Sequence, residues 1–179
     1  PFNASAGDQD LDHMSVLRLD PKGNDQWELT RATFDVSRPN GVLISRDQKT
    51  LYVAQSDYSP GQPRQLRAYP INDDGSLGDF VTLHTFGIDH LGVQRGVDGM
   101  TLDAEGNIVV CAGWEQSGPG PMIYVFAPTG RILETHALRV DRPTNCCFGD
   151  PDMKTLYVTT GGGHLFRART DRTGWIMWP

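Results

Sequence analysis

Short apolar runs alternate with polar turns along most of the chain. The runs are about four to six residues long, a length typical of β-strands. Turn sequences rich in Gly, Pro, Asn and Asp separate them: DPKGN at Asp20, NDDGS at Asn72, DAEGN at Asp103, APTGR at Ala127 and TDRTG at Thr170. Apolar residues at helical spacing are hard to find. The pattern therefore predicts an all-β fold built from short strands.

Three segments share a further pattern. They are RPNGVLISRDQKTLYV from Arg38, VDGMTLDAEGNIVV from Val97 and PTNCCFGDPDMKTLYV from Pro143. In each, a polar side chain (Asn40, Asp98 or Asn145) stands just before an apolar run, which is followed by a polar turn and a second apolar run. Other predicted hairpins, such as LRAYPINDDGSLG and IYVFAPTGRIL, alternate with these segments. The chain therefore contains an internal repeat.

The spacing of this repeat predicts the architecture. Asp98 follows Asn40 by 58 residues, and Asn145 follows Asp98 by 47. Four-stranded propeller blades of the best-known type are about 40–45 residues long. The loops SDYSPGQPRQ and HTFGIDHLGVQRG lengthen the first interval. We therefore predict a β-propeller, in which radial repetition of sheets protects their edges.

Two interpretations of Asn40, Asp98 and Asn145 are open at this point. In a propeller the innermost strands line a central channel, so side chains at one phase of the repeat converge there. Their oxygen atoms suit hard cations such as Ca²⁺, Mg²⁺ or Mn²⁺. Alternatively, Asn-Gly and Asp-Gly are tight-turn dipeptides that tolerate a positive φ. Asn145 is followed by Cys146, a poor residue for such a turn, and this favours the shared site a little.

Composition narrows the class of protein. The chain has 179 residues, 38% of them hydrophobic, and a mean hydropathy of −0.40, which predicts one globular domain with a core. The net charge of −6 with scattered basic residues argues against a nucleic-acid partner. No apolar run approaches the roughly 20 residues of a membrane span. The chain starts at Pro1 without an apolar leader, so its start is expected to be a processed end or the edge of a fragment.

Other reactive residue types form no recognisable site. The cysteines are Cys111, Cys146 and Cys147, which fit neither a disulfide framework nor zinc-ligand spacing. We expect them to be small buried strand residues, none catalytic, with no disulfide between the adjacent pair. The five histidines are expected on the surface or in loops. The GGGH sequence at Gly161–His164 lacks an accompanying GxSxG, so a glycine-rich turn is expected there.

The segments RPNGVLISRDQKTLYVA, VDGMTLDAEGNIVV and PTNCCFGDPDMKTLYVTTGGGHLFRAR resemble the gluconolactonase/regucalcin (senescence marker protein) family. The resemblance extends from about Ser15 to the end of the chain. It implies a six-bladed β-propeller lactonase with one divalent metal ion in the channel. The family's metal ligands are an early Glu, the Asn of the N-G segment and the Asp of the D-G-M segment. The last two correspond to Asn40 and Asp98, whereas Asn145 corresponds to a residue behind the ligands or in contact with substrate.

The resemblance also leaves a gap. Nothing before Ser15 resembles the family's first blades, and the early Glu ligand has no counterpart. We therefore expect residues 1–179 to form a partial propeller domain of about three and a half C-terminal blades. The missing blades would belong to a longer protein, or a second chain or a copy of this one would replace them.

The chemistry that the resemblance implies is hydrolysis of a cyclic sugar lactone. Ca²⁺ is the first choice of ion, with Mg²⁺, Mn²⁺ and Zn²⁺ as alternatives. Asp98 is the single carboxylate at the shared phase, so it is the candidate both for metal ligand and for general base. The alternatives are a non-catalytic propeller that binds a partner or a structural calcium ion, and a strictosidine-synthase-like or paraoxonase-like enzyme. The fragment alone is expected to be inactive.

Overall fold

The computed structural model describes residues 11–139 and 141–177, and all regular structure within them is β-strand. A hairpin comes first, formed by β1 (Leu17–Gly23) and β2 (Gln26–Arg31). The first sheet comprises β3 (Pro39–Ile44), β4 (Thr50–Ser56), β5 (Arg64–Pro70) and β6 (Val81–Phe86). A small hairpin of β7 (Ile88–Asp89) and β8 (Gly92–Val93) follows. The second sheet comprises β9 (Val97–Leu102), β10 (Ile108–Trp114), β11 (Ser117–Phe126) and β12 (Ile132–Ala137). The third comprises β13 (Pro143–Gly149), β14 (Thr155–Thr160) and β15 (Leu165–Arg169).

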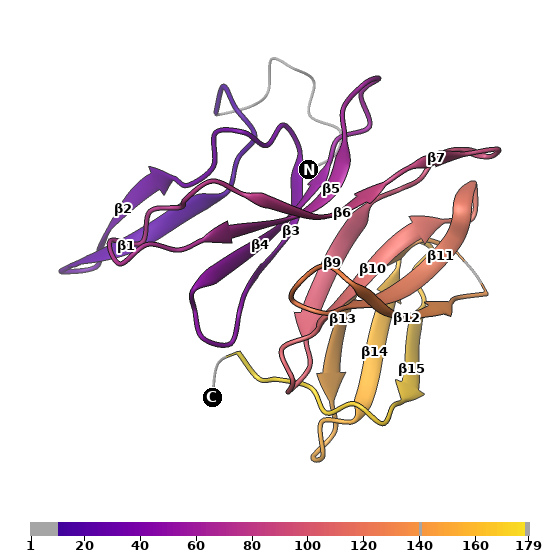
Figure 1. Ribbon diagram of the computed structural model, residues 1–179. Helices are drawn as coiled ribbons and strands as arrows, with labels where there is room; N and C mark the ends of the chain where they lie inside the picture. The colour runs from indigo at the N-terminus through magenta and orange to yellow at the C-terminus, as the bar shows by residue number, and fades with distance from the viewer. Residues whose placement is uncertain (1–10, 140, 178–179) are drawn as a thin grey trace.

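Each sheet is an antiparallel meander in which sequence neighbours pair. Figure 1 shows the three sheets arranged like a fan, with the first strand of each on the inner side. Of these strands, β9 contacts both β3 and β13. The all-β prediction and the propeller prediction are confirmed, whereas the number of blades in the whole ring stays a prediction.

Most of the core lies between neighbouring sheets, and a further buried cluster with Leu51, Val53 and Tyr69 lies on the other face of the first sheet. One cluster joins the first sheet to the second and includes Leu66, Phe86 and Phe126. Another joins the second sheet to the third and includes Phe148 and Val158. Strand β10 contributes to both clusters, because successive side chains of a strand point to opposite faces. Its sequence IVVCA is therefore continuously apolar, as expected of a strand that is buried on both faces.

The predicted turns connect the strands as expected. Gly75, Gly106 and Gly130 stand in the loops after β5, β9 and β11, with φ of 77°, 87° and 87°. Glycine is suited to this left-handed region because it has no Cβ atom. The GGGH sequence forms the turn between β14 and β15, and Gly163 within it has φ 86°.

The predictions for cysteine and histidine were partly wrong. Cys111 and Cys146 are buried, but Cys147 is exposed because β13 turns alternate side chains towards solvent. All three thiols are free. His84 lies in β6 rather than in a loop, and its ring packs against Phe86 and Phe126 at centroid distances of 4.7 and 5.2 Å. Burial lowers the pKa of His84, which favours the neutral ring.

The segment after β15 connects the sheets through hydrogen bonds and an aromatic contact. The amide of Ala104 donates to Thr173 O at 2.7 Å, Gly174 N donates to Met153 O at 2.7 Å, and Trp175 N donates to Leu102 O at 3.0 Å. The guanidinium of Arg46, in the turn between β3 and β4 of the first sheet, lies 4.2 Å from the Trp175 ring centroid. Residues 173–175 therefore connect all three sheets, and Figure 1 shows this segment running back beneath β9.

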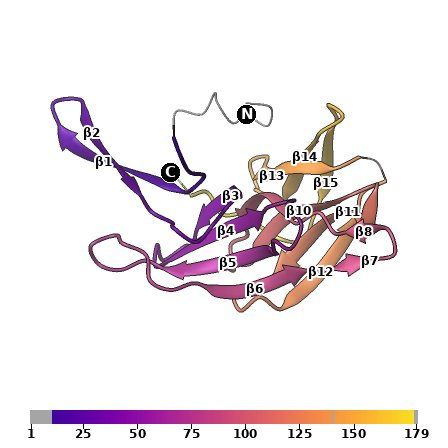
Figure 2. The ribbon, with the colours of Figure 1, turned by 90° about the horizontal axis from the view of Figure 1, so that it is seen from above.

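Two parts of the chain expose large apolar side chains. The hairpin β1–β2 projects away from the three sheets (Figure 2), and Leu19 and Trp27 on it are 61% and 63% exposed. At the other end, every residue of β15 is exposed, including Leu165 and Phe166. In the described part of the chain no helix is long and apolar enough to span a membrane.

Candidate functional site

Asn40, Asp98 and Asn145 lie on three neighbouring inner strands, and glycines bring these strands close together. A Cβ atom on Gly41 of β3 would stand 2.1 Å from the backbone oxygen of Asp98 on β9. A Cβ atom on Gly99 would stand 2.3 Å from Asn145 Oδ1 on β13. Any other residue at these two positions would push the strands apart. The structure therefore brings together the three residues that share a phase in the sequence repeat.

The tight-turn interpretation of the Asn-Gly and Asp-Gly pairs is wrong. Both pairs lie inside strands, Asn40-Gly41 in β3 and Asp98-Gly99 in β9. Neither glycine is among the residues with positive φ. These glycines are needed for close packing of backbones, in contrast to those in the hairpin turns.

A β-bulge occurs at the candidate residue in each of the three inner strands. The pairing of β3 with β4 shifts register between Pro39 and Val42, and the bulge contains Asn40 and Gly41. The pairing of β9 shifts between Val97 and Met100, across Asp98 and Gly99. The pairing of β13 shifts next to Asn145. A bulge bends the strand and re-aims a side chain, and bulges are frequent next to functional sites.

Asp98 is half-buried, and a buried arginine neutralises its charge. Arg95 Nη2 forms an ion pair with Asp98 Oδ2, and the two side chains are 9% and 17% exposed. Burial raises the pKa of the Asp98 carboxyl above its usual value. The charges of Arg95 and Arg142 and the amide of Asn40 oppose that rise. The carboxylate is therefore a stronger base than a free aspartate, but it is held in its charged form by cationic neighbours.

The two asparagines differ in their surroundings. Asn40 is half-buried, and its side-chain amide lies close enough to Asp98 to affect the carboxyl. Asn145 is exposed, and its Oδ1 accepts a hydrogen bond from the amide of Cys146 at 2.9 Å. This hydrogen bond fixes the asparagine side chain.

The side-chain oxygens of these three residues could supply some of the ligands of a hard cation. One carboxylate and two amides offer oxygen atoms of the type that Ca²⁺, Mg²⁺ and Mn²⁺ bind. Zn²⁺ more often takes His or Cys ligands, and neither type belongs to this set. Residues 11–139 and 141–177 contain no group of three or more His, Cys, Asp or Glu side chains placed to hold a metal. Asn40 and Asp98 therefore fit as part of a coordination sphere that needs further oxygen ligands.

Arg95 is not among the residues predicted from the sequence. Its importance depends on contacts with residues distant in the sequence, so no local pattern identifies it. A weak signal exists nonetheless, because Arg38, Arg95 and Arg142 precede Asn40, Asp98 and Asn145 by two or three residues. Each repeat therefore has an arginine at nearly the same distance before its polar residue.

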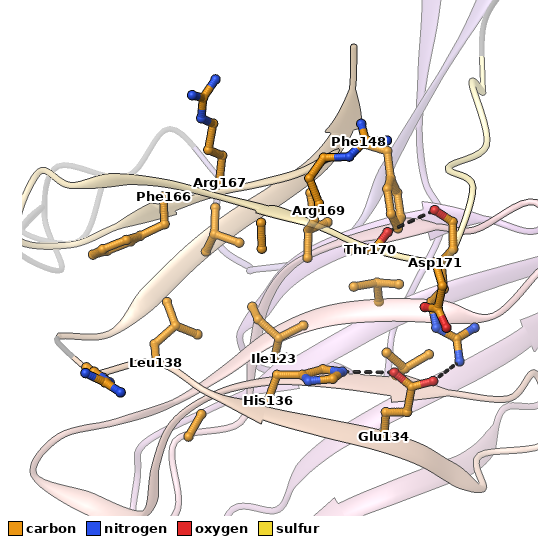
Figure 3. A pocket seen from close by; sticks show the side chains of 18 residues that line it. Ile123, Glu134, His136, Leu138, Phe148, Phe166, Arg167, Arg169, Thr170 and Asp171 are labelled. Carbon is orange, nitrogen blue, oxygen red and sulfur yellow. Dashed lines mark hydrogen bonds and ion pairs between the residues drawn. The ribbon is translucent and has the colours of Figure 1, made fainter. Parts of the chain in front are cut away.

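A groove of about 520 Å³ lies elsewhere, between the second and third sheets (Figure 3). Apolar side chains such as Ile123, Leu138 and Phe166 line it, together with Glu134 and Arg169. None of the three candidate residues lines this groove. It lies beside β12 and β15, where the third sheet has three strands in the described part of the chain and the second has four. The groove is therefore a gap between sheets, separate from the candidate site.

Comparison with known proteins gives a consistent result. Residues 3–162 match the family described as SMP-30/Gluconolactonase/LRE-like region. A gluconolactonase of Zymomonas mobilis is 31% identical over 169 residues, which are 93% of this chain and 43% of that protein. A regucalcin of Xenopus laevis is 32% identical over 122 residues, 68% of this chain and 36% of that protein. The solved structure of a gluconolactonase from Xanthomonas campestris is 31% identical, with a TM-score of 0.64 over 89% of this chain and 46% of that one. The chain thus spans less than half the length of these relatives.

Proposed function

Because the chain belongs to the SMP-30/gluconolactonase/LRE-like family, we propose that the intact protein hydrolyses sugar lactones with the help of a divalent cation. The observation that supports this most directly is the convergence of Asn40, Asp98 and Asn145 on three bulged inner strands. The sequence relatives in this family include a protein named gluconolactonase. The geometry supplies a carboxylate and two amides where those strands meet.

Asn40 and Asp98 would hold the cation through their side-chain oxygens, and Ca²⁺ suits such ligands best. When bound, a divalent cation polarises the lactone carbonyl and stabilises the negative charge that develops on its oxygen. The ion would need further oxygen ligands from water or from residues beyond these two. Asn145, exposed beside Gly99, would donate a hydrogen bond to a substrate hydroxyl.

Asp98 is the candidate general base. Its carboxylate would accept a proton from water while the water oxygen adds to the lactone carbonyl carbon. The ring C–O bond then breaks, the leaving oxygen takes up a proton, and the product is the open-chain sugar acid. Asp98 can act as a base because Arg95 keeps its carboxyl group charged.

A titration of the intact protein tests this proposal. Lactone hydrolysis is measured by the protons that it releases. After chelation and dialysis we expect its rate to fall to the uncatalysed rate, and to recover when Ca²⁺, Mg²⁺ or Mn²⁺ is added. Calorimetry would measure ion binding separately from turnover. Binding of Ca²⁺ without turnover of any sugar lactone would support a structural calcium site instead.

A further inference from the structure

Arg95 is among the few buried charged residues of the described chain, with 7% of its surface exposed. Both terminal nitrogens of its guanidinium form polar contacts. Nη1 donates to the backbone oxygens of Gly113 at 3.1 Å and Pro143 at 2.9 Å, and Nη2 pairs with Asp98 Oδ2. Its own backbone oxygen accepts a hydrogen bond from Gly113 N at 3.0 Å. A buried charge is tolerated when it is both paired and hydrogen-bonded, and Arg95 meets both conditions.

These contacts connect three strands at one point. Gly113 belongs to β10, Asp98 to β9, and Pro143 is the first residue of β13, two positions before Asn145. We infer that Arg95 is a positioning residue for the candidate site, because one planar guanidinium holds the Asp98 carboxylate and the start of the strand that carries Asn145. Lysine could not replace it, since an ammonium is a point charge that lacks the rigid fork of donors.

The ion pair also decides which oxygen of Asp98 is available. Oδ2 is engaged by Arg95, so Oδ1, which has two lone pairs, is the oxygen left for both the cation and the attacking water. The neighbouring positive charge opposes cation binding, whereas the fixed orientation favours it. In metal sites the groups that orient a ligand typically change affinity or activity by about 10–100-fold when they are removed, so we expect the loss of orientation to dominate.

The inference rests on the proposed function and is tested by Arg95→Lys, Arg95→Met and Arg95→Ala in the intact protein. Arg131→Met is the matched control, because Arg131 is exposed on the turn before β12. We expect Ca²⁺ affinity, measured by calorimetry, to fall about 10–100-fold in both Arg95→Lys and Arg95→Met, and kcat to fall more than KM changes. Free guanidinium at a non-denaturing concentration should restore part of the Ca²⁺ affinity and of kcat in Arg95→Ala, whereas NaCl of equal ionic strength should not.

Thermal unfolding of each variant shows whether it is folded before binding is measured. Ca²⁺ affinity and kcat equal to those of the parent in Arg95→Lys would overturn the inference. Tighter Ca²⁺ binding by Arg95→Met would overturn it as well, because Arg95 would then act only through its charge. If the parent binds Ca²⁺ but hydrolyses no lactone, the proposed function fails, and the affinity series still decides the role of Arg95. If Arg95→Ala is unfolded, the Lys variant and the calorimetric readout decide.

Discussion

Cys111 on β10 and Cys146 on β13 pack in one buried cluster across the boundary between the second and third sheets, where Cys146 lies close enough to affect the Cys111 thiol. This contact and burial raise the pKa of Cys111 well above its usual value. A thiol reacts as its thiolate, so Cys111 is expected to be unreactive in the folded protein. Cys147, one residue along β13, is exposed.

We therefore predict that native alkylation with iodoacetamide modifies Cys147 alone and leaves lactone hydrolysis unchanged. Mass spectrometry should show a single adduct within this chain before denaturation and three adducts afterwards. Complete loss of activity at one adduct, with the fold intact by circular dichroism, would contradict the view that none of the cysteines is catalytic.

The glycines between the inner strands give a second prediction. Gly41→Ala would place a methyl group against Asp98 O, and Gly99→Ala would place one against Asn145. Each should lower the free energy of unfolding by about 1–3 kcal/mol, the usual cost of overpacking. Gly87→Ala is the control, since a Cβ there meets no atom within 4 Å. Equal denaturant midpoints for all three variants and the parent would show that the strands can separate without cost.

Asp98 and Asn40 should differ in their effect on catalysis. Asp98→Asn should lower kcat by a factor on the order of 10²–10⁴, the usual loss on removing a general base. Asn40→Ala should chiefly weaken metal binding, because an amide contributes only a dipole, and excess metal should restore part of its activity. Unfolding is monitored because Asp98→Asn also leaves Arg95 without its counter-charge. Parent-like turnover and metal binding in both variants would remove these residues from the site.

Exposed apolar residues on the first and last strands predict that the isolated chain associates. Leu19, Trp27, Leu165 and Phe166 are exposed on β1, β2 and β15, and exposed apolar surface beside a free strand edge promotes association. We expect residues 1–179 alone to form oligomers or aggregates and to lack lactonase activity. Light scattering after size-exclusion chromatography measures this directly. A monodisperse, cooperatively melting monomer would be incompatible with a partial propeller.

Arg172 gives a prediction for pH dependence. It pairs with buried Asp103 at 2.7 Å and with Glu134, and hydrogen bonds from Arg172 and then His136 lower the pKa of Glu134 below 4.5. A lowered carboxyl pKa stabilises the fold above the unfolded-state pKa, and this contribution disappears as the pH falls through the folded-state value.

Arg172→Met should therefore cost roughly 1–3 kcal/mol at neutral pH, because it leaves Asp103 without its counter-charge. The part of this cost that comes from losing the pair with Glu134 should shrink when urea unfolding is repeated below pH 4.5. A difference that stays constant down to the acid transition would mean that Arg172 acts through packing alone.

The sequence predicted the hairpins well, because turn chemistry and strand alternation are local properties. Gly106 and Gly130 stand in turns as their neighbours indicate, and the apolar sequence of β10 indicates burial on both faces. Asn40, Asp98 and Asn145 were recognisable because a repeat places equivalent residues at equivalent positions in space. Their functional roles remain predictions.

Other features depend on contacts between distant residues and were not predictable from the sequence. The bulges at the candidate residues arise from register between strands, which local composition does not encode. The role of Gly41 and Gly99 in strand packing depends on the neighbouring sheet, so the same dipeptides also fit a turn. Arg95 belongs to the site through Gly113 and Pro143, which follow it by 18 and 48 residues.

The segment that fastens the three sheets has a consequence for synthesis on the ribosome. All strands of these sheets precede residues 173–175 in the sequence, and each sheet pairs only sequence neighbours. Each meander can therefore form while translation continues. The bonds from Thr173, Gly174 and Trp175 can form only after these residues leave the exit tunnel. A nascent chain stalled when β15 has left the exit tunnel but Thr173 has not should hold all three sheets without these bonds. The sheets therefore form before residues 173–175 connect them.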